Sequence, residues 1–150
     1  MGYGVPAAVA MKILDPARPV VCVAGDGDFL MSGQEFSTAV QYGLPFVVVL
    51  ADNGMYVTIR MHQERDYPGR TVATALKNPD FAAYAKAFGG FGATVEKTAD
   101  FAAAYTAAVS SGKPAIIHLK VDPEAITPSA TLSGIREKSL AGSKPSGTHR

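Results

Sequence analysis

The sequence predicts an α/β fold, a parallel sheet with helices on both faces. Two apolar runs, at 20–24 and 46–51, lack the apolar-polar alternation of a half-exposed strand, as strands covered on both faces do. Helix-like segments separate these runs from two later strand-like segments, at 93–96 and 115–121. Strands that alternate with helices in this way are typical of parallel sheets.

The composition indicates a globular chain rather than a membrane or nucleic-acid-binding protein. The 150 residues are 47% hydrophobic and carry a formal net charge of +1, which gives no basic footprint for nucleic acid. No segment approaches the ~18 consecutive apolar residues of a membrane span. The single cysteine, Cys22, excludes disulfides and cysteine metal clusters. We therefore expect a cytoplasmic protein with no nucleic-acid or membrane partner.

The chain is expected to start on a helix rather than on a strand. Pro6 suits the first turn of a helix, where its missing N–H costs nothing. Val5, Val9 and Ile13 recur at the spacing of one helical face. Asp15, which precedes a proline, is expected to end the helix. It is unusual for a complete domain to begin on a well-packed helix with no strand before it.

Ser32 and Glu35 mark the start of the second helix. Their spacing is that of a capping box, which places the helix start at about Gly33. Gly43, followed two residues later by a proline, is expected to end it. The polar segment at 56–74 is expected to be a functional loop, because long polar segments after a strand often are.

The second half of the chain continues the alternation. Asn78 and the proline after it are expected to cap a helix with Phe81, Tyr84 and Phe88 in the core. An alanine-rich helix is expected at 98–111, closed by a glycine and a proline.

The C-terminal part turns polar after the last strand. A helix is expected at 129–140, and residues 141–150, rich in Ser, Gly and Lys, are expected to be disordered. We therefore expect a domain at 1–125, followed by a C-terminal helix and flexible tail at 126–150.

Two loops at strand ends form a candidate site for a cation and a phosphate. Gly25-Asp26-Gly27 follows the first apolar strand, and Asp52-Asn53-Gly54 follows the second. A right-handed crossover places both loops on the same rim of the sheet, where open α/β sheets bind their ligands. Asp26, Asn53 and a backbone carbonyl near Met55 offer oxygens that suit Mg²⁺.

Glycines beside Asp26 favour phosphate binding at the first loop. Gly25 and Gly27 let the backbone approach a phosphate closely, and the amides of Asp28 and Phe29 are expected to donate to it.

Each loop also has an ordinary structural interpretation. Gly-Asp-Gly alone is a common turn. Asn53-Gly54 is typical of a hairpin, with 56–59 as the returning strand. The apolar run at 46–51 argues against the hairpin, because it lacks the alternation of a half-exposed strand.

The spacing of the two loops resembles the thiamine diphosphate signature. Gly25-Asp26-Gly27 is followed after twenty-four residues by Asp52-Asn53, as Gly-Asp-Gly is followed by Asn-Asn in that family. The first eight residues, MGYGVPAA, resemble a segment of acetolactate-synthase-like enzymes. The segments at 78–81 and 114–121 are similar to the same group, so the resemblance covers about residues 1–125.

The resemblance implies roles for individual residues. Asp26 and Asn53 would ligate Mg²⁺ together with the backbone carbonyl of Met55, and Met1 would support the bent cofactor between its rings. The implied cofactor-binding positions are Met1, Gly25, Asp26, Gly27, Asp28, Phe29, Asn53 and Met55. The implied activity is that of a lyase or transferase, in which a C2 carbanion of thiamine diphosphate attacks a 2-oxo acid.

The chain departs from the family pattern at three points. Asp52 replaces the first Asn of the signature. The chain has no tryptophan, and His62 falls near the position where acetolactate synthases carry one. The glutamate that activates the cofactor comes in this family from a separate pyrimidine-binding domain, usually in a neighbouring subunit. The resemblance also implies a strand and a helix before the Met-Gly segment, so we expect the fold to be N-terminally incomplete. We further expect a partner domain or subunit, a homo-oligomeric full enzyme, and no activity of the isolated chain.

Two other functions remain open at this stage. The β subunit of a 2-oxo-acid:ferredoxin oxidoreductase has a similar Gly-Asp-Gly-Asp start, but usually brings cysteines for iron–sulfur clusters. The chain could also be an inert fragment or an interaction module. His118, on the last strand, is interpreted as a surface or packing residue rather than a ligand.

Overall fold

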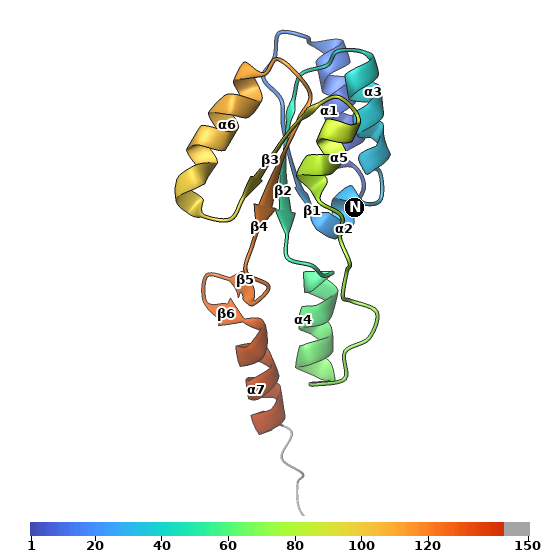
Figure 1. The fold of residues 1–150 in the computed structure, drawn as a ribbon. Coiled ribbons are helices and arrows are strands. Elements are labelled where there is room, and N and C mark those ends of the chain that lie inside the picture. The colour runs from blue at the N-terminus through green and yellow to red at the C-terminus, as the bar shows by residue number, and fades with distance from the viewer. Residues whose placement is uncertain (143–150) are drawn as a thin grey trace, which may run out of the picture. The chain divides into compact units, whose positions relative to one another are not determined.

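The computed structural model describes residues 1–142 and divides them into two compact units (Figure 1). The first unit comprises 1–53 and 77–121, and the second comprises 54–76 and the described residues from 122 onward. The expected disordered tail falls mostly outside the described residues, although Ala141 and Gly142 belong to the last helix.

A four-stranded parallel sheet forms the centre of the first unit (Figure 1). The strand order is β1-β2-β4-β3, so the last of these four strands along the chain lies between two earlier ones. All three pairings are parallel, with Gly25 beside Ala51 and Asp52 beside Lys120. The strands are β1 (Val21–Gly25), β2 (Val47–Asp52), β3 (Phe91–Val95) and β4 (Ala115–Lys120).

Helices pack on both faces of this sheet, which confirms the predicted α/β fold. On one face, buried residues of the first, third and fifth helices meet Val48, Leu50 and Ile116. On the other face, the sixth helix packs on Val47 and Ile117. The helices of this unit are α1 (Gly4–Leu14), α2 (Asp26–Phe29), α3 (Phe36–Gln41), α5 (Phe81–Ala87) and α6 (Phe101–Ser110).

One side of β1 is exposed, so the expectation that this strand is covered on both faces is wrong. Val21 is 46% exposed and Val23 is 75% exposed, whereas Cys22 and Ala24 are buried. The physical reason is that α6 contacts β2, β3 and β4, at the other edge of the sheet.

Several helix boundaries differ from the sequence prediction. The segment from Gly33 to Glu35 is a 3₁₀ turn, and the Ser32 hydroxyl donates to the carbonyl of Gly2 instead of capping it. Asp80, rather than Asn78, caps α5 by accepting from the backbone N–H groups of Ala82 and Ala83.

Two expected core residues are partly exposed. Ile13 is 57% exposed and Phe88 is 38% exposed. Both lie at the C-terminal end of their helix, Ile13 as the residue before last of α1 and Phe88 as the C-cap of α5. Phe81 is fully buried, as expected.

The second unit contains a helix where a long loop was expected. Its elements are α4 (Val57–Asp66), β5 (Ala125–Thr127), β6 (Ala130–Thr131) and α7 (Leu132–Gly142). The fully buried Glu64 on α4 is hydrogen-bonded to Arg136 of α7, so a polar contact rather than an apolar stripe holds this helix. The hairpin interpretation of Asn53-Gly54 is also wrong, because β2 pairs in parallel with both neighbours and the chain enters α4.

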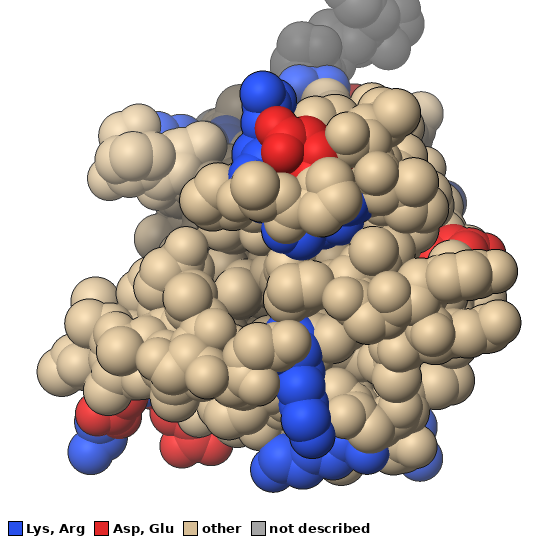
Figure 2. All heavy atoms as spheres, turned by 90° about the horizontal axis from the view of Figure 1, so that it is seen from above, with Lys and Arg blue, Asp and Glu red and all other residues tan. Residues whose placement is uncertain are grey.

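Charged side chains are scattered over the face that is seen from the amino-terminal ends of the strands (Figure 2). Lysine, arginine and acidic groups stand singly or in small groups among uncharged residues there. This distribution agrees with the net charge of +1. None of the described helices has the length and apolar character needed to cross a membrane.

Candidate functional site

The candidate site lies at the carboxyl ends of the strands in the first unit. Asp26 follows β1 directly, and Asp52 is the last residue of β2. Gly25 and Ala51 are paired across the two strands, so the two carboxylates start from adjacent positions on the rim. This confirms that the two loops come together, as the strand–helix–strand pattern predicts.

Asp26 is a buried, hydrogen-bonded carboxylate. It is 3% exposed. Its Oδ1 accepts from the backbone N–H of Gly27 at 2.9 Å, and its Oδ2 accepts from Nδ2 of Asn78 at 2.7 Å. The carboxylate therefore has a fixed orientation.

The short helix α2 begins at Asp26, so Asp28 and Phe29 lie in its first turn. Backbone N–H groups of a first turn have no acceptor within their helix. The Asp28 side chain accepts from the backbone N–H of Gly2 at 2.7 Å. The Phe29 ring is 2% exposed and packs edge-on against Phe81 and Tyr84, so only its backbone is suited to contact a ligand.

Asp52 accepts hydrogen bonds from three side chains. Its Oδ2 lies 2.7 Å from both Nε2 of His118 and Nζ of Lys120. Its Oδ1 lies 2.7 Å from Nδ2 of Asn78. Burial acts to raise the pKa of the Asp52 carboxyl. Hydrogen bonds from Lys120, His118 and Asn78 outweigh this effect and hold the pKa well below its usual range, with the bond from Lys120 contributing most among them. Asp52 is therefore a charge-compensated anion at neutral pH.

The remaining residues expected at the site are distributed over both units. Asn53 follows β2 and is half-buried. Met1 is 71% exposed. Met55 belongs to the second unit, where it forms an isolated antiparallel bridge with Ala75. Gly25 is the residue before α2 and has extended backbone.

Asn78, His118 and Lys120 were not assigned to the site from the sequence. Asn78 was interpreted as a helix cap, and His118 as a surface or packing residue. His118 is 1% exposed and does pack edge-on against Phe81, but it also contacts Asp52. For two of them the sequence does contain a signal that could have been used. His118 and Lys120 are two residues apart at the carboxyl end of a strand, on the same rim as Asp52.

A cavity of about 290 Å³ adjoins this cluster. Two atoms of residues that line it, Oδ1 of Asn78 and Nδ1 of His118, are buried without a hydrogen-bond partner among the described residues. Nδ1 of His118 lies 3.7 Å from Oδ1 of Asp80, too far for a hydrogen bond. The lining residues are Asn78, Pro79, Asp80, Thr94, Glu96, His118 and Lys120.

The donor set suits a hard cation that also takes ligands from elsewhere. Within the described residues, no group of three or more His, Cys, Asp or Glu side chains is arranged to hold a metal ion. A buried carboxylate at Asp26 and an amide oxygen at Asn53 fit Mg²⁺, which usually binds one or two protein carboxylates and completes its shell with water and phosphate oxygens. The residues present therefore fit a Mg²⁺–diphosphate group rather than a metal held by protein alone.

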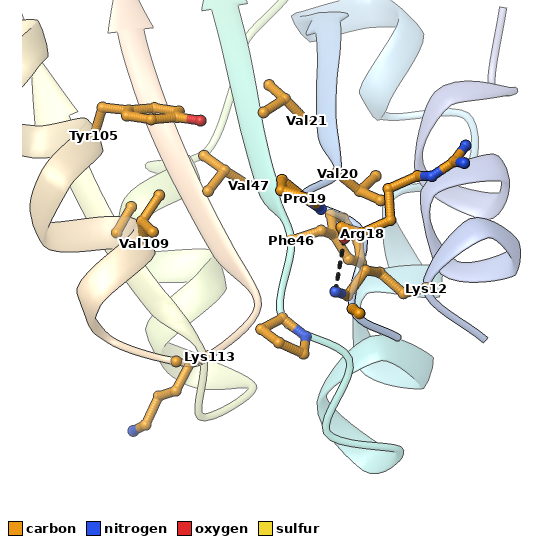
Figure 3. Close-up of a pocket in the computed structure, with 14 residues that line it drawn as sticks. Lys12, Arg18, Pro19, Val20, Val21, Phe46, Val47, Tyr105, Val109 and Lys113 are labelled. Carbon is orange, nitrogen blue, oxygen red and sulfur yellow. Dashed lines mark hydrogen bonds between the residues drawn. The ribbon is translucent and has the colours of Figure 1, made fainter. Parts of the chain in front are cut away.

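A second cavity, of about 250 Å³, lies at the opposite ends of the strands (Figure 3). It is lined mainly by apolar side chains, including Val21 and Val47 at the strand starts and Tyr105 and Val109 on α6. Nζ of the buried Lys12 donates to two backbone carbonyls beside it, one of them that of Arg18. This cavity shares no residue with the candidate site.

Together, the fold and the rim residues define an open α/β domain of the class that binds ligands beside the carboxyl ends of its strands. A family model described as "Thiamine pyrophosphate enzyme, C-terminal TPP binding domain" matches residues 1–119. The chain belongs to this family, which confirms the acetolactate-synthase-like resemblance of its sequence motifs.

Relatives in sequence are acetolactate synthases. The chain is 35% identical over 144 residues to the acetolactate synthase isozyme 2 large subunit of Escherichia coli, covering 92% of this chain and 26% of that protein. It is 38% identical over 123 residues to the acetolactate synthase large subunit of Parasynechococcus marenigrum, covering 81% of this chain and 20% of that protein. These relatives do not favour the ferredoxin oxidoreductase alternative.

Solved structures give the same family. The thiamine diphosphate-dependent 4-hydroxybenzoylformate decarboxylase of Rhodococcus jostii aligns with a TM-score of 0.75 and 29% identity, over 81% of this chain and 23% of that chain. The benzoylformate decarboxylase of Polynucleobacter necessarius aligns with a TM-score of 0.74 and 28% identity, over 82% of this chain and 24% of that chain. The chain spans about a quarter of the length of the relatives it matches.

Proposed function

We propose that this chain binds the diphosphate of thiamine diphosphate through Mg²⁺, as part of a 2-oxo-acid decarboxylase or carboligase of the acetolactate synthase type. The observation that carries the proposal is the position of Asp26 and Asn53 directly after neighbouring parallel strands. The names of the relatives, acetolactate synthases and thiamine diphosphate-dependent decarboxylases, agree with this assignment.

Each residue of the proposed site has a defined task. Asp26, Asn53 and the backbone carbonyl of Met55 hold the cation. The backbone of Gly27, Asp28 and Phe29 binds the diphosphate, with Gly25 allowing its close approach. Met1 supports the cofactor.

The protein supplies binding and orientation, while the cofactor supplies the chemistry. When bound, thiamine diphosphate provides a nucleophilic C2 carbanion for attack on a 2-oxo acid. Activation of its aminopyrimidine ring requires a glutamate, and none of the glutamates of this chain is assigned to that task. We propose that a pyrimidine-binding domain or subunit of a homo-oligomeric enzyme supplies this glutamate.

Calorimetric titration tests the cation–diphosphate site. Wild-type chain and Asp26→Ala are titrated with thiamine diphosphate in the presence of Mg²⁺. We expect wild type to bind and the variant to lose binding, because its cation loses the only buried carboxylate proposed to ligate it. Asp100→Ala, an aspartate exposed at the start of α6, is the matched control and is expected to bind as wild type does. Equal binding by wild type and Asp26→Ala would contradict the proposal.

A further inference from the structure

Two buried carboxylates stand next to each other on the rim of the sheet. Asp26 is 3% exposed and Asp52 is 6% exposed. One oxygen of each lies 2.7 Å from the same nitrogen, Nδ2 of Asn78. Like charges this close disfavour each other's ionised form unless other groups compensate them. Hydrogen-bond donors beside the pair are therefore needed to hold the two carboxylates in place.

Asp52 has two side-chain partners on a neighbouring strand. Its Oδ2 accepts from both His118 and Lys120, and both donors reach it from β4. Asp26 accepts hydrogen bonds from the backbone N–H of Gly27 and from the amide of Asn78. Asp52 is therefore held in place by β4, and Asn78 contacts both carboxylates.

Asn78 is the link between them. Its amide nitrogen uses one hydrogen on each carboxylate, so the compensated Asp52 fixes the amide, and the amide fixes Asp26. Its Oδ1 is buried without a hydrogen-bond partner among the described residues, which leaves an acceptor beside the site. Mg²⁺ in proteins usually retains water ligands that can donate to such an acceptor.

We propose that Asn78 is a positioning residue of the cation site, anchored by the cluster of Asp52, His118 and Lys120. It sets the orientation of the Asp26 carboxylate and offers its amide oxygen to a cation-bound water. This inference rests on the proposed function, because it assumes a cation at Asp26. It adds that the residue at position 52, where the family signature has asparagine, works here together with a lysine and a histidine from β4.

The experiment measures cation affinity directly rather than catalysis. Binding of Mn²⁺ in the presence of thiamine diphosphate is followed by electron paramagnetic resonance on the full 150-residue chain. Asn78→Ala is expected to bind Mn²⁺ about 10- to 100-fold more weakly than wild type, the usual effect of removing a residue that orients a metal ligand. Asn78→Ser, whose hydroxyl still donates one hydrogen bond, is expected to recover part of the affinity.

A control separates positioning from general stability. Val47→Ala removes buried volume from the core face under α6, at the opposite ends of the strands from the site, and is expected to lower the stability of the fold but not the Mn²⁺ affinity. Unfolding of all variants without ligand is measured alongside.

A second measurement needs no cofactor. Asn53 and Asn78 are the only asparagines of the chain, so labelling with ¹⁵N-asparagine gives two side-chain amide signals. In the ligand-free chain we expect the Asn78 signal to exchange slowly with solvent and to shift in Lys120→Met, which removes part of its anchor. A rapidly exchanging Asn78 amide that ignores this substitution would overturn the inference.

The outcomes separate the two proposals. Weak binding by Asn78→Ala with normal binding by Val47→Ala supports the positioning role. Wild-type affinity in Asn78→Ala, when Asp26→Ala has lost binding, overturns the positioning role and leaves the proposed function standing. Wild type that binds no better than Asp26→Ala overturns the proposed function, and the positioning role with it.

Discussion

Glu64 carries the most heavily paired carboxylate of the second unit. It is fully buried and accepts hydrogen bonds from the side chains of Arg136 and Arg60 and from the backbone N–H of Gly69. Hydrogen bonds from Arg136, against an opposing effect of burial, lower the pKa of Glu64 to about 2. Its ordinary value is 4.5.

This pKa shift predicts an acid-sensitive contribution to stability. Because the folded-state pKa lies below the unfolded one, the contribution is fully present above pH 4.5 and is lost as the pH falls toward 2. Glu64→Gln is expected to lower the free energy of unfolding by about 1.5–3 kcal/mol at pH 7, the range for hydrogen bonds to charged groups. Urea denaturation from pH 7 to pH 2.5 should show that the difference in the free energy of unfolding between wild type and variant decreases as the pH falls.

A matched substitution tests whether the effect comes from this pairing. Glu137, on the same helix as Arg136, is exposed. Glu137→Gln is expected to change the free energy of unfolding little at any pH. A difference in the free energy of unfolding between wild type and Glu64→Gln that stays constant over the whole pH range would contradict the role of the charged carboxylate.

At the level of residues, the sequence alone was enough to predict where one half of the candidate site lies in the fold. Asp26 and Asn53 follow apolar strands directly, so their positions can be predicted from local pattern and from the rule for strand–helix–strand handedness. Their neighbours Asn78 and His118 could not be assigned in this way. Each contacts Asp52 across a long separation in sequence, and only the strand order brings them together.

Among the elements, α5 depends on a single capping side chain. Asp80 accepts hydrogen bonds from two backbone N–H groups of the first turn, those of Ala82 and Ala83. These bonds lower the pKa of the Asp80 carboxyl, and the bond from Ala83 has the largest effect. Asp80→Ala is expected to cost about 1 kcal/mol of stability at neutral pH, typical of a lost N-cap. The loss should shrink in acid, because protonation of Asp80 removes the same charged acceptor in wild type.

Asp100 provides the comparison for this cap. It occupies the equivalent position before α6 but makes no side-chain cap bond. Thermal unfolding should therefore show a lower midpoint for Asp80→Ala than for Asp100→Ala. Equal midpoints would show that the two hydrogen bonds of Asp80 contribute nothing measurable.

Elements with an apolar pattern were predicted to within a few residues, and the polar helix α4 was missed. Strands β2 and β4 begin within a residue of the apolar runs that predicted them. In contrast, α4 has no apolar face, and its buried residue is a glutamate whose partner lies on α7. Local sequence cannot indicate burial of a charge when the opposite charge is 72 residues away.

At the scale of the whole molecule, we predict that the exposed side of β1 takes part in self-association. Val23 projects from an edge strand of the sheet and is 75% exposed. Uncovered apolar edge strands are templates for pairing with another chain. Val23→Lys is expected to reduce association in sedimentation velocity while leaving the free energy of unfolding nearly unchanged. Val72, a valine of the second unit, is 70% exposed, and Val72→Lys should not reduce association.

A further prediction concerns activity. The chain spans about a quarter of its relatives' length, and no glutamate in it is assigned to activate the cofactor. We expect no steady turnover of pyruvate by the purified 150-residue chain with thiamine diphosphate and Mg²⁺, measured as acetolactate or carbon dioxide released. Sustained turnover that depends on Asp26 would contradict the proposal that a separate domain or subunit supplies the activating glutamate.

The strand order also has a consequence for synthesis on the ribosome. Of the four strands of this sheet, β4 is made last but fills the gap between β2 and β3, so until residue 120 has emerged only β1 and β2 can pair. The same strand carries His118 and Lys120, which hydrogen-bond to Asp52. A growing chain therefore gains its central strand and these partners of Asp52 in one late step. Parallel pairings over long sequence separations form slowly, and strand edges that stay unpaired during this interval are prone to aggregate.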